Sequence, residues 1–447
     1  MRAYWGWALL LAVVLEFLLL TFWRNCAGPY LSPVLFYLAS WLVALFATRS
    51  YQQTGWYGAA STRTTRRFLL VVPLLALGAF IPRLARVFAR SPLVVSASDV
   101  IPSINIYVER LLHGQPVYSY FTELGYTLYP TYLPALWLPF VVPEVLGFDY
   151  RWLAAGVLAV ALLVFYCWPV VKQPSRWAEL LLKLVLPFVM LQGVLKMDVG
   201  LFGYSVESLI IGYYLCLAAS LYRRSSWQRA APLVLCLLSR FSLVLWVPLW
   251  LALIWQQEGR TSALRLSAGV ALGVLLLYVL PFLSHDWQAL ALGQQTYLRA
   301  AQSDWQQLLP GTQQPWPLYQ GLGFAAYFYQ YAPGTLLHRI ELIRLVQAGS
   351  CLLVVLAAAV YWFRYRPALD YRLFALVVLK VYLATFYAFV QVPYSYLVTL
   401  VIFMSLPLLA LAKLMPAALA TADVAPPPAA PKRRRIRLTP RPVRLLR

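Results

Sequence analysis

The sequence predicts an all-α fold, a polytopic bundle of transmembrane helices, and three observations support this. Of the 447 residues, 62% are hydrophobic and only 12% are charged. The mean hydropathy is +0.69, and apolar runs of spanning length recur along the chain. Because soluble chains average about 45–50% apolar and about 25% charged residues, the composition excludes a soluble enzyme, a DNA-binding module and a secreted disulfide scaffold.

The apolar runs define the expected membrane segments, each of which needs about 20 apolar residues. The first run, Tyr4 to Trp23, is long and precedes no small-residue cleavage site, which predicts a retained anchor. Further runs lie at residues 30–48, 68–88, 130–147, 150–171, 177–195, 202–221, 231–256, 264–283, 340–363, 371–390 and 395–414. Together they predict 11–13 membrane segments in one transmembrane domain, residues 1–415.

The basic residues predict the orientation of the bundle. The chain has 37 Lys and Arg against 15 Asp and Glu, a net charge of +22. Since short cytoplasmic loops are enriched in Lys and Arg, residues 49–67 should be cytoplasmic, and the large loops 91–129 and 284–338 extracytoplasmic. Two full crossings between 130 and 171 would place the basic Lys172 outside. Either one segment there is short or re-entrant, or the charge rule fails locally.

The C-terminal stretch 416–447 differs from the rest of the chain. It holds seven prolines and eight Lys or Arg residues against one acid, Asp423. Such a composition cannot bury a core, so it predicts a disordered cytoplasmic tail. Its charge favours contact with anionic lipid over binding of nucleic acid.

Acidic residues are the informative ones in so apolar a chain, because an ionised carboxylate is costly near lipid. Glu16 lies inside the first run without an evident partner. The five cysteines and three histidines are scattered without metal-ligand spacing, so no metal site is predicted. The acids expected on or near the outer face are Asp99, Glu109, Glu123, Asp198, Glu207, Asp286, Asp304 and Glu341.

Residues 98–118 form the richest stretch of the first large loop. Apolar residues recur there at helical spacing, at Ile104, Tyr107, Val108, Leu111 and Leu112. The run is too short to span, which predicts a helix lying at the membrane surface and ended by Gly114. Asp99 stands just before this helix. It is either an ordinary N-terminal cap or a general base held at the boundary between water and lipid.

The motifs around Asp99 resemble those of a known protein family. These are Ser98-Asp99, Tyr107, Leu112-His113-Gly114-Gln115-Pro116-Val117-Tyr118, Tyr129-Pro130 and Leu146-Gly147-Phe148-Asp149-Tyr150-Arg151. They resemble the first-loop signature of GT-C glycosyltransferases, most of all the bacterial mannosyltransferase-like members that depend on polyprenyl-phosphate sugars. The resemblance implies a multi-span enzyme of the bacterial inner membrane with an extracytoplasmic active site, and Asp99 as its catalytic base.

The resemblance implies substrate-binding roles for further residues. Lys196-Met197-Asp198 and Gly203-Tyr204-Ser205-Val206-Glu207 suggest that Glu207 or Asp198 positions substrate or a metal, although both also suit ordinary helix ends. Arg240 suits phosphate binding or an internal salt bridge equally well. Tyr394 belongs to a segment, 392–397, that resembles the last extracytoplasmic turn but lacks the histidines of some relatives. The remaining candidates for substrate binding are Glu109, His113, Tyr118 and Tyr129.

The function predicted from these residues is transfer of a hexose, mannose or another, from a polyprenyl-phosphate carrier to a glycan, lipid or protein acceptor, with inversion. The charge of the leaving phosphate would be stabilised by Arg240, Arg83, Arg86 or Arg90. The cofactor is unknown, with a divalent metal as an open alternative and no nucleotide cofactor expected. Two rivals remain: a transporter or flippase of lipid-linked glycans, and a non-catalytic subunit for envelope assembly. The second predicts no convergence of Asp99, Glu207 and Arg240.

Overall fold

The computed structural model describes residues 4–51, 67–173, 175–319, 322–365 and 369–414. Within these ranges the chain is helical and contains no β-strand, only two isolated bridges. Seven of the described helices are long and apolar enough to cross a membrane: Gly28–Tyr51, Val71–Arg90, Tyr150–Lys172, Trp177–Met197, Arg260–Leu283, Leu336–Tyr365 and Tyr371–Ala388. Four shorter apolar helices are Tyr4–Leu20, Pro134–Leu146, Glu207–Ser220 and Ser395–Leu411. These helices agree with a multi-pass membrane protein. The predicted tail, 416–447, lies outside the described residues.

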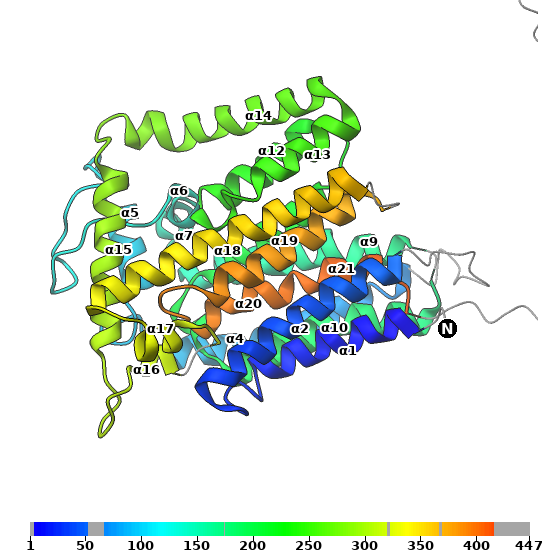
Figure 1. Cartoon of the computed structure of the whole chain (residues 1–447). Coiled ribbons are helices and arrows are strands. Elements are labelled where there is room, and N and C mark those ends of the chain that lie inside the picture. Colours follow the sequence, from blue (N-terminus) through cyan, green and yellow to red (C-terminus); the bar gives the residue numbers. More distant parts are fainter. Residues whose placement is uncertain (1–3, 52–66, 174, 320–321, 366–368, 415–447) are drawn as a thin grey trace, which may run out of the picture.

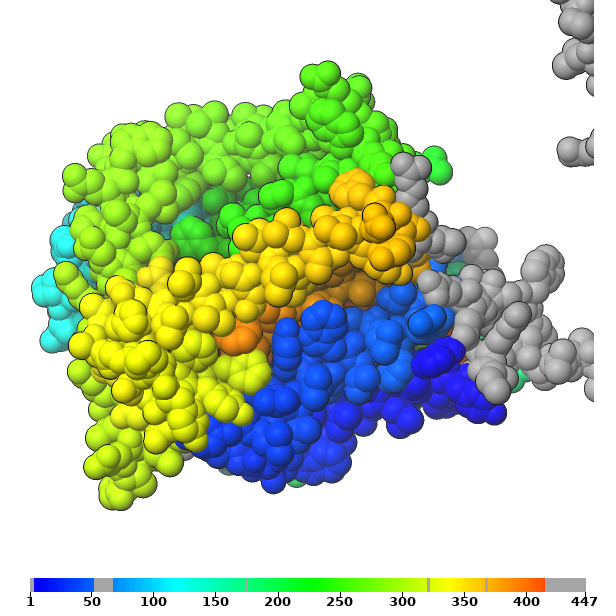
Figure 2. Space-filling view, viewed as in Figure 1, coloured from blue at the N-terminus to red at the C-terminus, as the bar shows by residue number. Residues whose placement is uncertain are grey.

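The bundle is built from helices that pack side by side (Figure 1). Neighbouring pairs include α1 with α2, α2 with α19, α18 with α19, α4 with α10, and α8 with α11. Their bounds are α1 Tyr4–Leu20, α2 Gly28–Tyr51, α4 Val71–Arg90, α8 Tyr150–Ala161, α10 Trp177–Met197, α11 Glu207–Ser220, α18 Leu336–Tyr365 and α19 Tyr371–Ala388. The surface is hollowed between the green α14 segment, Arg260–Val274, and α18 (Figure 2).

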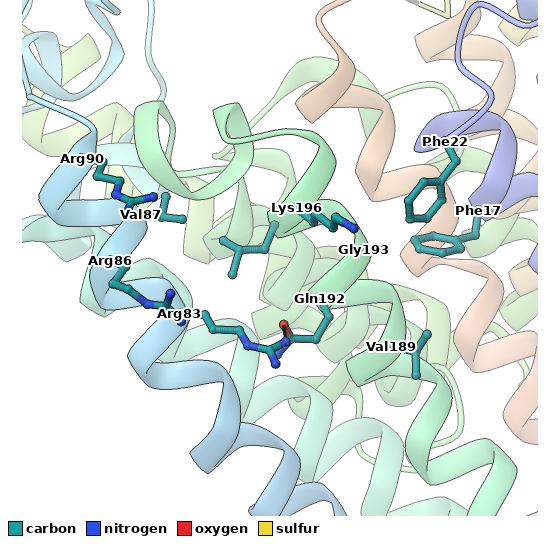
Figure 3. Close-up of a pocket in the computed structure, with 11 residues that line it drawn as sticks. Phe17, Phe22, Arg83, Arg86, Val87, Arg90, Val189, Gln192, Gly193 and Lys196 are labelled. Carbon is teal, nitrogen blue, oxygen red and sulfur yellow. Dashed lines mark hydrogen bonds between the residues drawn. The ribbon is translucent and has the colours of Figure 1, made fainter.

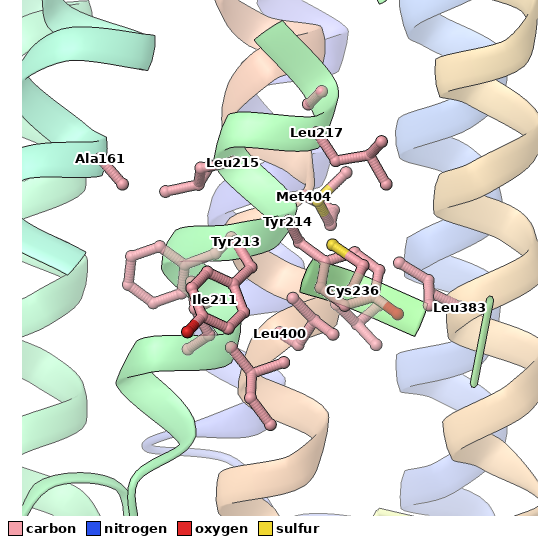
Figure 4. Packing of buried hydrophobic residues seen from close by; sticks show 14 of the residues in the cluster. Ala161, Ile211, Tyr213, Tyr214, Leu215, Leu217, Cys236, Leu383, Leu400 and Met404 are labelled. Carbon is pink, nitrogen blue, oxygen red and sulfur yellow. The ribbon is translucent and has the colours of Figure 1, made fainter. Parts of the chain in front are cut away.

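Helix α11 lies at the centre of the bundle. Twelve of its 14 residues are buried, as expected for a helix that is apolar on every side. Its Tyr214 and Leu217 pack near Leu400 and Met404 of the C-terminal helices and Leu383 of α19 (Figure 4). These C-terminal helices are α20 (Ser395–Phe403) and α21 (Ser405–Leu411), and both contact α11.

The predicted single run 231–256 is in fact a helical hairpin. Helices α12 (Ser226–Leu237) and α13 (Val247–Glu258) are each 12 residues long, about 18 Å at 1.5 Å per residue. Arg229, near the start of α12, forms an ion pair of 2.7 Å with Glu258 at the end of α13. The two helices therefore run antiparallel, and neither spans a hydrocarbon core of about 30 Å. Hydropathy alone gives no signal for the reversal at 238–246.

The predicted run 130–147 also fails to span. It forms short pieces, α6 (Pro134–Trp137), η1 (Leu138–Phe140) and α7 (Val141–Leu146), which pack against α5 (Val100–Leu112). Prolines at 134, 139 and 143 interrupt the backbone hydrogen bonding of a longer helix. Together with the hairpin, this reduces the number of spanning helices below the 11–13 expected.

These two corrections resolve the uneven charge pattern of the middle region. Helices α5, α15 (Ala289–Gln306), α16 (Trp316–Tyr319) and α17 (Ala325–Tyr331) gather at one end of the bundle, here called the α5 end (Figure 1). Helix α9 (Trp168–Lys172), which carries Lys172, lies at the opposite end. Tyr222, beside Arg223, is close enough to Asp370 and Arg372 to feel their charges. Both large loops thus share one end, and the basic connections lie at the other.

The structure supplies the missing partner of Glu16. This carboxylate is fully buried in α1 and forms an ion pair with Lys380 of α19. Ser40 of α2 and Ser405 of α21 donate hydrogen bonds to it at 2.5 and 2.6 Å. The four side chains tie together helices from both ends of the sequence, because a buried charge is tolerated only when it is paired and hydrogen-bonded.

Removing one member of this pair should destabilise the bundle. We expect Lys380→Met to lower the free energy of unfolding by about 3–5 kcal/mol, since it leaves Glu16 charged and buried without its counter-ion. The double variant Glu16→Gln/Lys380→Met should lose much less. Thermal unfolding in detergent measures both, with Arg224→Met as the control for loss of an exposed cation. A double variant as unstable as Lys380→Met would contradict the pairing.

Candidate functional site

Residues 392–396, which lead into α20 and include its first two residues, bring the candidate site together and are called the 392–396 segment. The rings of Tyr394 and Tyr396 stack with centroids 5.4 Å apart and planes 9° from parallel. Ser395, between them, donates a hydrogen bond to Asp198. The segment therefore links Asp198 to a pair of stacked tyrosine rings.

Asp99 occupies the N-cap position of α5, but its side chain caps no backbone amide. Its Oδ2 instead accepts a hydrogen bond of 2.6 Å from the hydroxyl of Tyr126. The neighbouring Ser98 Oγ accepts from the amide of Val100 at 3.4 Å and donates to the carbonyl of Tyr204 at 3.0 Å. The carboxylate is thus not used as a helix cap, the simpler of the two alternatives for this residue.

A second carboxylate, Asp304 of α15, lies close to Asp99. Burial raises the pKa of Asp304 to about 6, the negative charge of Asp99 adds to the rise, and a hydrogen bond from Tyr394 opposes it. Burial and the charges of Asp304 and Asp99 hold the pKa of Tyr394 above its usual range. Asp304 is among the outer-face acids expected from the sequence, but no spacing links it to Asp99. Tyr126 and Tyr396 are not among the predicted residues.

Glu207 and Arg240 form an ion pair at the first residue of α11 and the turn of the α12–α13 hairpin. Glu207 is buried, and the Arg240 side chain is 21% exposed. The Nε of Arg240 finds no hydrogen-bond acceptor among the described residues. Both charges act on Tyr396, and Tyr297 of α15 is also within electrostatic reach of Arg240. The salt-bridge alternative for Arg240 is therefore what the structure contains.

Asp198 follows α10 and joins the site through Ser395. Its carboxylate also lies 3.8 Å from Arg24 and accepts a hydrogen bond of 2.9 Å from the amide of Gly200. A Cβ on Gly200 would lie 2.9 Å from Oδ1 of Asp198 and 3.2 Å from the ring of Tyr396. A residue without a side chain is thus needed where the chain passes the tyrosine.

Four predicted substrate-binding residues do not join this group. Glu109 of α5 and His113, which directly follows α5, are exposed, and the imidazole forms a hydrogen bond of 2.7 Å with the carbonyl of Glu109. Tyr118 donates to the carbonyl of Tyr132 at 2.8 Å, and Tyr129 donates to Asp286 at 3.1 Å. Among the residues that the structure describes, none of the four forms a hydrogen bond with Asp99, Asp198, Glu207 or Arg240.

Arg151 holds the framework of the site, although the sequence assigns it no role. Its guanidinium, buried in α8, donates to the carbonyls of Ser91 at 2.8 Å and Gly203 at 3.0 Å, and pairs with Asp149 at 2.5 Å. It therefore fastens the end of α4, where the first large loop begins, to the turn that precedes Glu207. An arginine next to a long apolar run is the signal that could have identified it.

A separate cavity of about 620 Å³ opens between α4, α10 and the end of α1 (Figure 3). It contains all three arginines of α4 proposed above as phosphate ligands, together with Lys196 of α10. Arg83 donates a hydrogen bond of 2.5 Å to Gln192. The cavity is lined by Phe17, Phe22, Arg83, Arg86, Val87, Arg90, Val189, Gln192, Gly193, Leu195 and Lys196. Arg240 is not among them, so the four arginines belong to two different places.

Comparisons with known proteins add no further assignment. No protein-family model, curated protein or solved structure matches the chain. Within the described ranges there is no group of three or more His, Cys, Asp or Glu side chains that could hold a metal ion.

The Glu207–Arg240 pair should behave as a coupled unit. We expect Glu207→Gln to lower the free energy of unfolding by about 3–5 kcal/mol, because it leaves a largely buried guanidinium unpaired. Adding Arg240→Gln should restore part of the loss, which thermal unfolding of all four proteins in detergent would measure. Strictly additive effects would show that the two charges do not interact.

Asp304 should make stability depend on pH. Because its pKa is about 6 in the folded protein against an ordinary value of 3.8, the folded state binds more protons between these values, and stability falls as pH rises from about 4 to about 6. Asp304→Asn removes this loss, so the variant should gain about 1–3 kcal/mol on the wild type across that window. Thermal unfolding at pH 4, 5, 6 and 7 measures the gain. Gln302→Asn, a neutral change on the same helix, is the control, and an identical profile in both variants would refute the assignment.

Proposed function

We propose that this protein is an integral-membrane glycosyltransferase of the GT-C type. It transfers a hexose from polyprenyl phosphate to a hydroxyl of a glycan, lipid or protein acceptor. The observation that supports it is the meeting of Asp99, Asp198, Glu207, Arg240 and Tyr394 around the 392–396 segment. A subunit without catalytic activity does not require these residues, distant in sequence, to meet.

Asp99 is the residue best placed to act as general base. Its Oδ2 is held by Tyr126, while its Oδ1 accepts no hydrogen bond from the described residues. That oxygen is available to an acceptor hydroxyl within hydrogen-bond reach, the geometry that general base catalysis requires. The half-buried position of Asp99 also allows water to be replaced by substrate.

In the proposed step, the acceptor hydroxyl transfers its proton to Asp99 as its oxygen attacks the anomeric carbon. The new glycosidic C–O bond forms while the bond between the anomeric carbon and the phosphate oxygen breaks. The electron pair of that bond leaves with the phosphate, and polyprenyl phosphate is the product. A single displacement of this kind inverts the anomeric centre. Cationic side chains lower the barrier by stabilising the charge that develops on the leaving group.

Asp304, Tyr394 and Tyr297 are proposed to position the sugars. They come from α15 and the 392–396 segment and lie within electrostatic reach of one another. Carboxylate and phenol groups form hydrogen bonds with sugar hydroxyls, and tyrosine rings provide an apolar face for the sugar ring. Helix α15 would then form one wall of the site, through Tyr297 and Asp304.

The α5 end is proposed to face the outside of a bacterial inner membrane, with α5 lying at the membrane surface and the C-terminal tail in the cytoplasm. Lys172 of α9 and the arginines that follow α11 support this orientation, since they lie at the end of the bundle opposite to the α5 end and positive loops stay in the cytoplasm. Membrane lipid is the expected surrounding partner, and no nucleic acid is involved.

The base assignment predicts the effect of Asp99→Asn. We expect the rate of polyprenyl-phosphate release to fall by about 100-fold or more, because a general base contributes about 10²–10⁴. The assay uses purified full-length protein in nanodiscs with polyprenyl-phosphate mannose as donor and a glycolipid extract as acceptor. Glu123→Gln is the matched control, since Glu123 is an acid of the same loop, is 52% exposed and pairs with Arg110.

The same assay separates the proposal from its rivals. Release that persists unchanged in Asp99→Asn would remove this residue from the chemistry. Movement of intact polyprenyl-phosphate mannose across the membrane without release would instead identify a transporter. A thermal unfolding curve like that of the wild type shows that a loss of rate in the variant is not a loss of folding.

A further inference from the structure

The cavity between α4 and α10 gathers positive charge without any negative partner. Arg83, Arg86 and Arg90 follow one another at i, i+3 and i+7, which places them on one face of α4. Lys196 reaches the same cavity from α10 (Figure 3). None of the four belongs to any of the seven ion pairs formed among the described residues.

All four of these side chains are exposed, whereas cations that are buried inside the bundle form ion pairs. The buried cations Lys183, Arg229 and Lys380 are each paired with a carboxylate. Helix α4 is one of the seven helices long and apolar enough to cross a membrane, and cations in such a helix are costly unless they are neutralised. Like charges three and four residues apart also repel one another. The arrangement is therefore that of a site completed by an anion.

The geometry of the cationic groups suits a phosphate. Arg83 is held in place by Gln192, and Arg86 contacts only a backbone carbonyl of its own helix, at 3.4 Å. No hydrogen bond from Arg90 or Lys196 to another described side chain is present. Arginine forks bind phosphate oxygens in pairs, and lysine adds a point charge. Three guanidinium groups and one ammonium group thus line one cavity, each with N–H groups available for a ligand.

The opposite wall of the cavity is apolar. Phe17 of α1, Phe22 beyond its end and Val189 of α10 line it (Figure 3). Gly193 is what allows the approach, because a Cβ at that position would lie 2.3 Å from Cζ of Phe17. A free phosphate ion makes no favourable contact with this apolar wall. A phosphate carried on a hydrocarbon chain contacts both the cationic and the apolar side of the cavity.

We propose that this cavity binds the phosphate group of a membrane lipid. Arg86, Arg90 and Lys196 bind the phosphate oxygens, Arg83 reinforces them, and Phe17 contacts the first carbons of the chain. The proposal rests on the cavity and does not depend on the transferase activity. The cavity nevertheless belongs to the same end of the bundle as Asp99, because Arg90 precedes Ser91, whose carbonyl Arg151 holds, and Lys196 precedes Asp198 by two residues.

The test measures binding of three probes to the full-length protein in phosphatidylcholine nanodiscs: dodecyl phosphate, dodecanol and inorganic phosphate. We expect dodecyl phosphate to bind at least about tenfold more tightly than either of the other two. Arg86→Gln/Arg90→Gln should weaken it about tenfold or more, since charge-assisted hydrogen bonds are lost. The matched control is Arg223→Gln/Arg224→Gln, which removes two exposed arginines at the other end of the bundle and should change binding less than twofold.

Each other outcome overturns the proposal. Equal weakening in both double variants would show only bulk electrostatic attraction. Dodecanol binding as tight as that of dodecyl phosphate would remove the phosphate from recognition, and equally tight inorganic phosphate would remove the lipid. Lys196→Gln, an exposed change at a helix end, repeats the test if the arginine variant unfolds. Asp99→Asn should bind dodecyl phosphate like the wild type, so a failure of the transferase proposal and a failure of this one are distinguishable.

Discussion

The ion pair between Glu207 and Arg240 is the interaction on which the arrangement of the candidate site depends. It joins the first residue of the largely buried helix α11 to the turn of the α12–α13 hairpin. Because neither charge is stable alone in an apolar interior, the hairpin must reach far enough into the bundle for its turn to meet α11. That depth brings Arg240 within reach of Tyr396 and of α15.

The same requirement organises the rest of the bundle. Glu16 with Lys380, Glu179 with Lys183, and Arg229 with Glu258 each pair a charge that the apolar surroundings would otherwise reject. Glu179 and Lys183 both belong to α10. The other two pairs join different helices and consequently fix the height of one helix relative to its partner, which apolar contacts alone do poorly because they have no direction. In the cavity beside α4, the four cations form no ion pair with another described residue.

Much of the fold could be predicted from local sequence, and much of the site could not. Composition predicts the all-helical class, and the spacing of Ile104, Tyr107 and Val108 predicts α5. Hydropathy cannot show that residues 231–256 reverse direction, because the apolar run continues through both arms of the hairpin. It also cannot show that Asp304 lies beside Asp99, or that Lys380 neutralises Glu16, since such contacts depend on tertiary packing between distant segments. The pairing of Arg240 could be expected, but the identity of its partner could not.

The position of the 392–396 segment has a consequence for how the protein is made. Proteins are synthesised from the N-terminus, and early segments fold before later ones exist. Asp99, Asp198, Glu207 and Arg240 are therefore already in the membrane while the residues that link them are still to be translated. Tyr394, Ser395 and Tyr396 arrive after α18 and α19, close to the end of the bundle. The site is thus completed at the last stage of biogenesis, because an unfinished chain that stops before α20 lacks Ser395, the hydrogen-bond partner of Asp198.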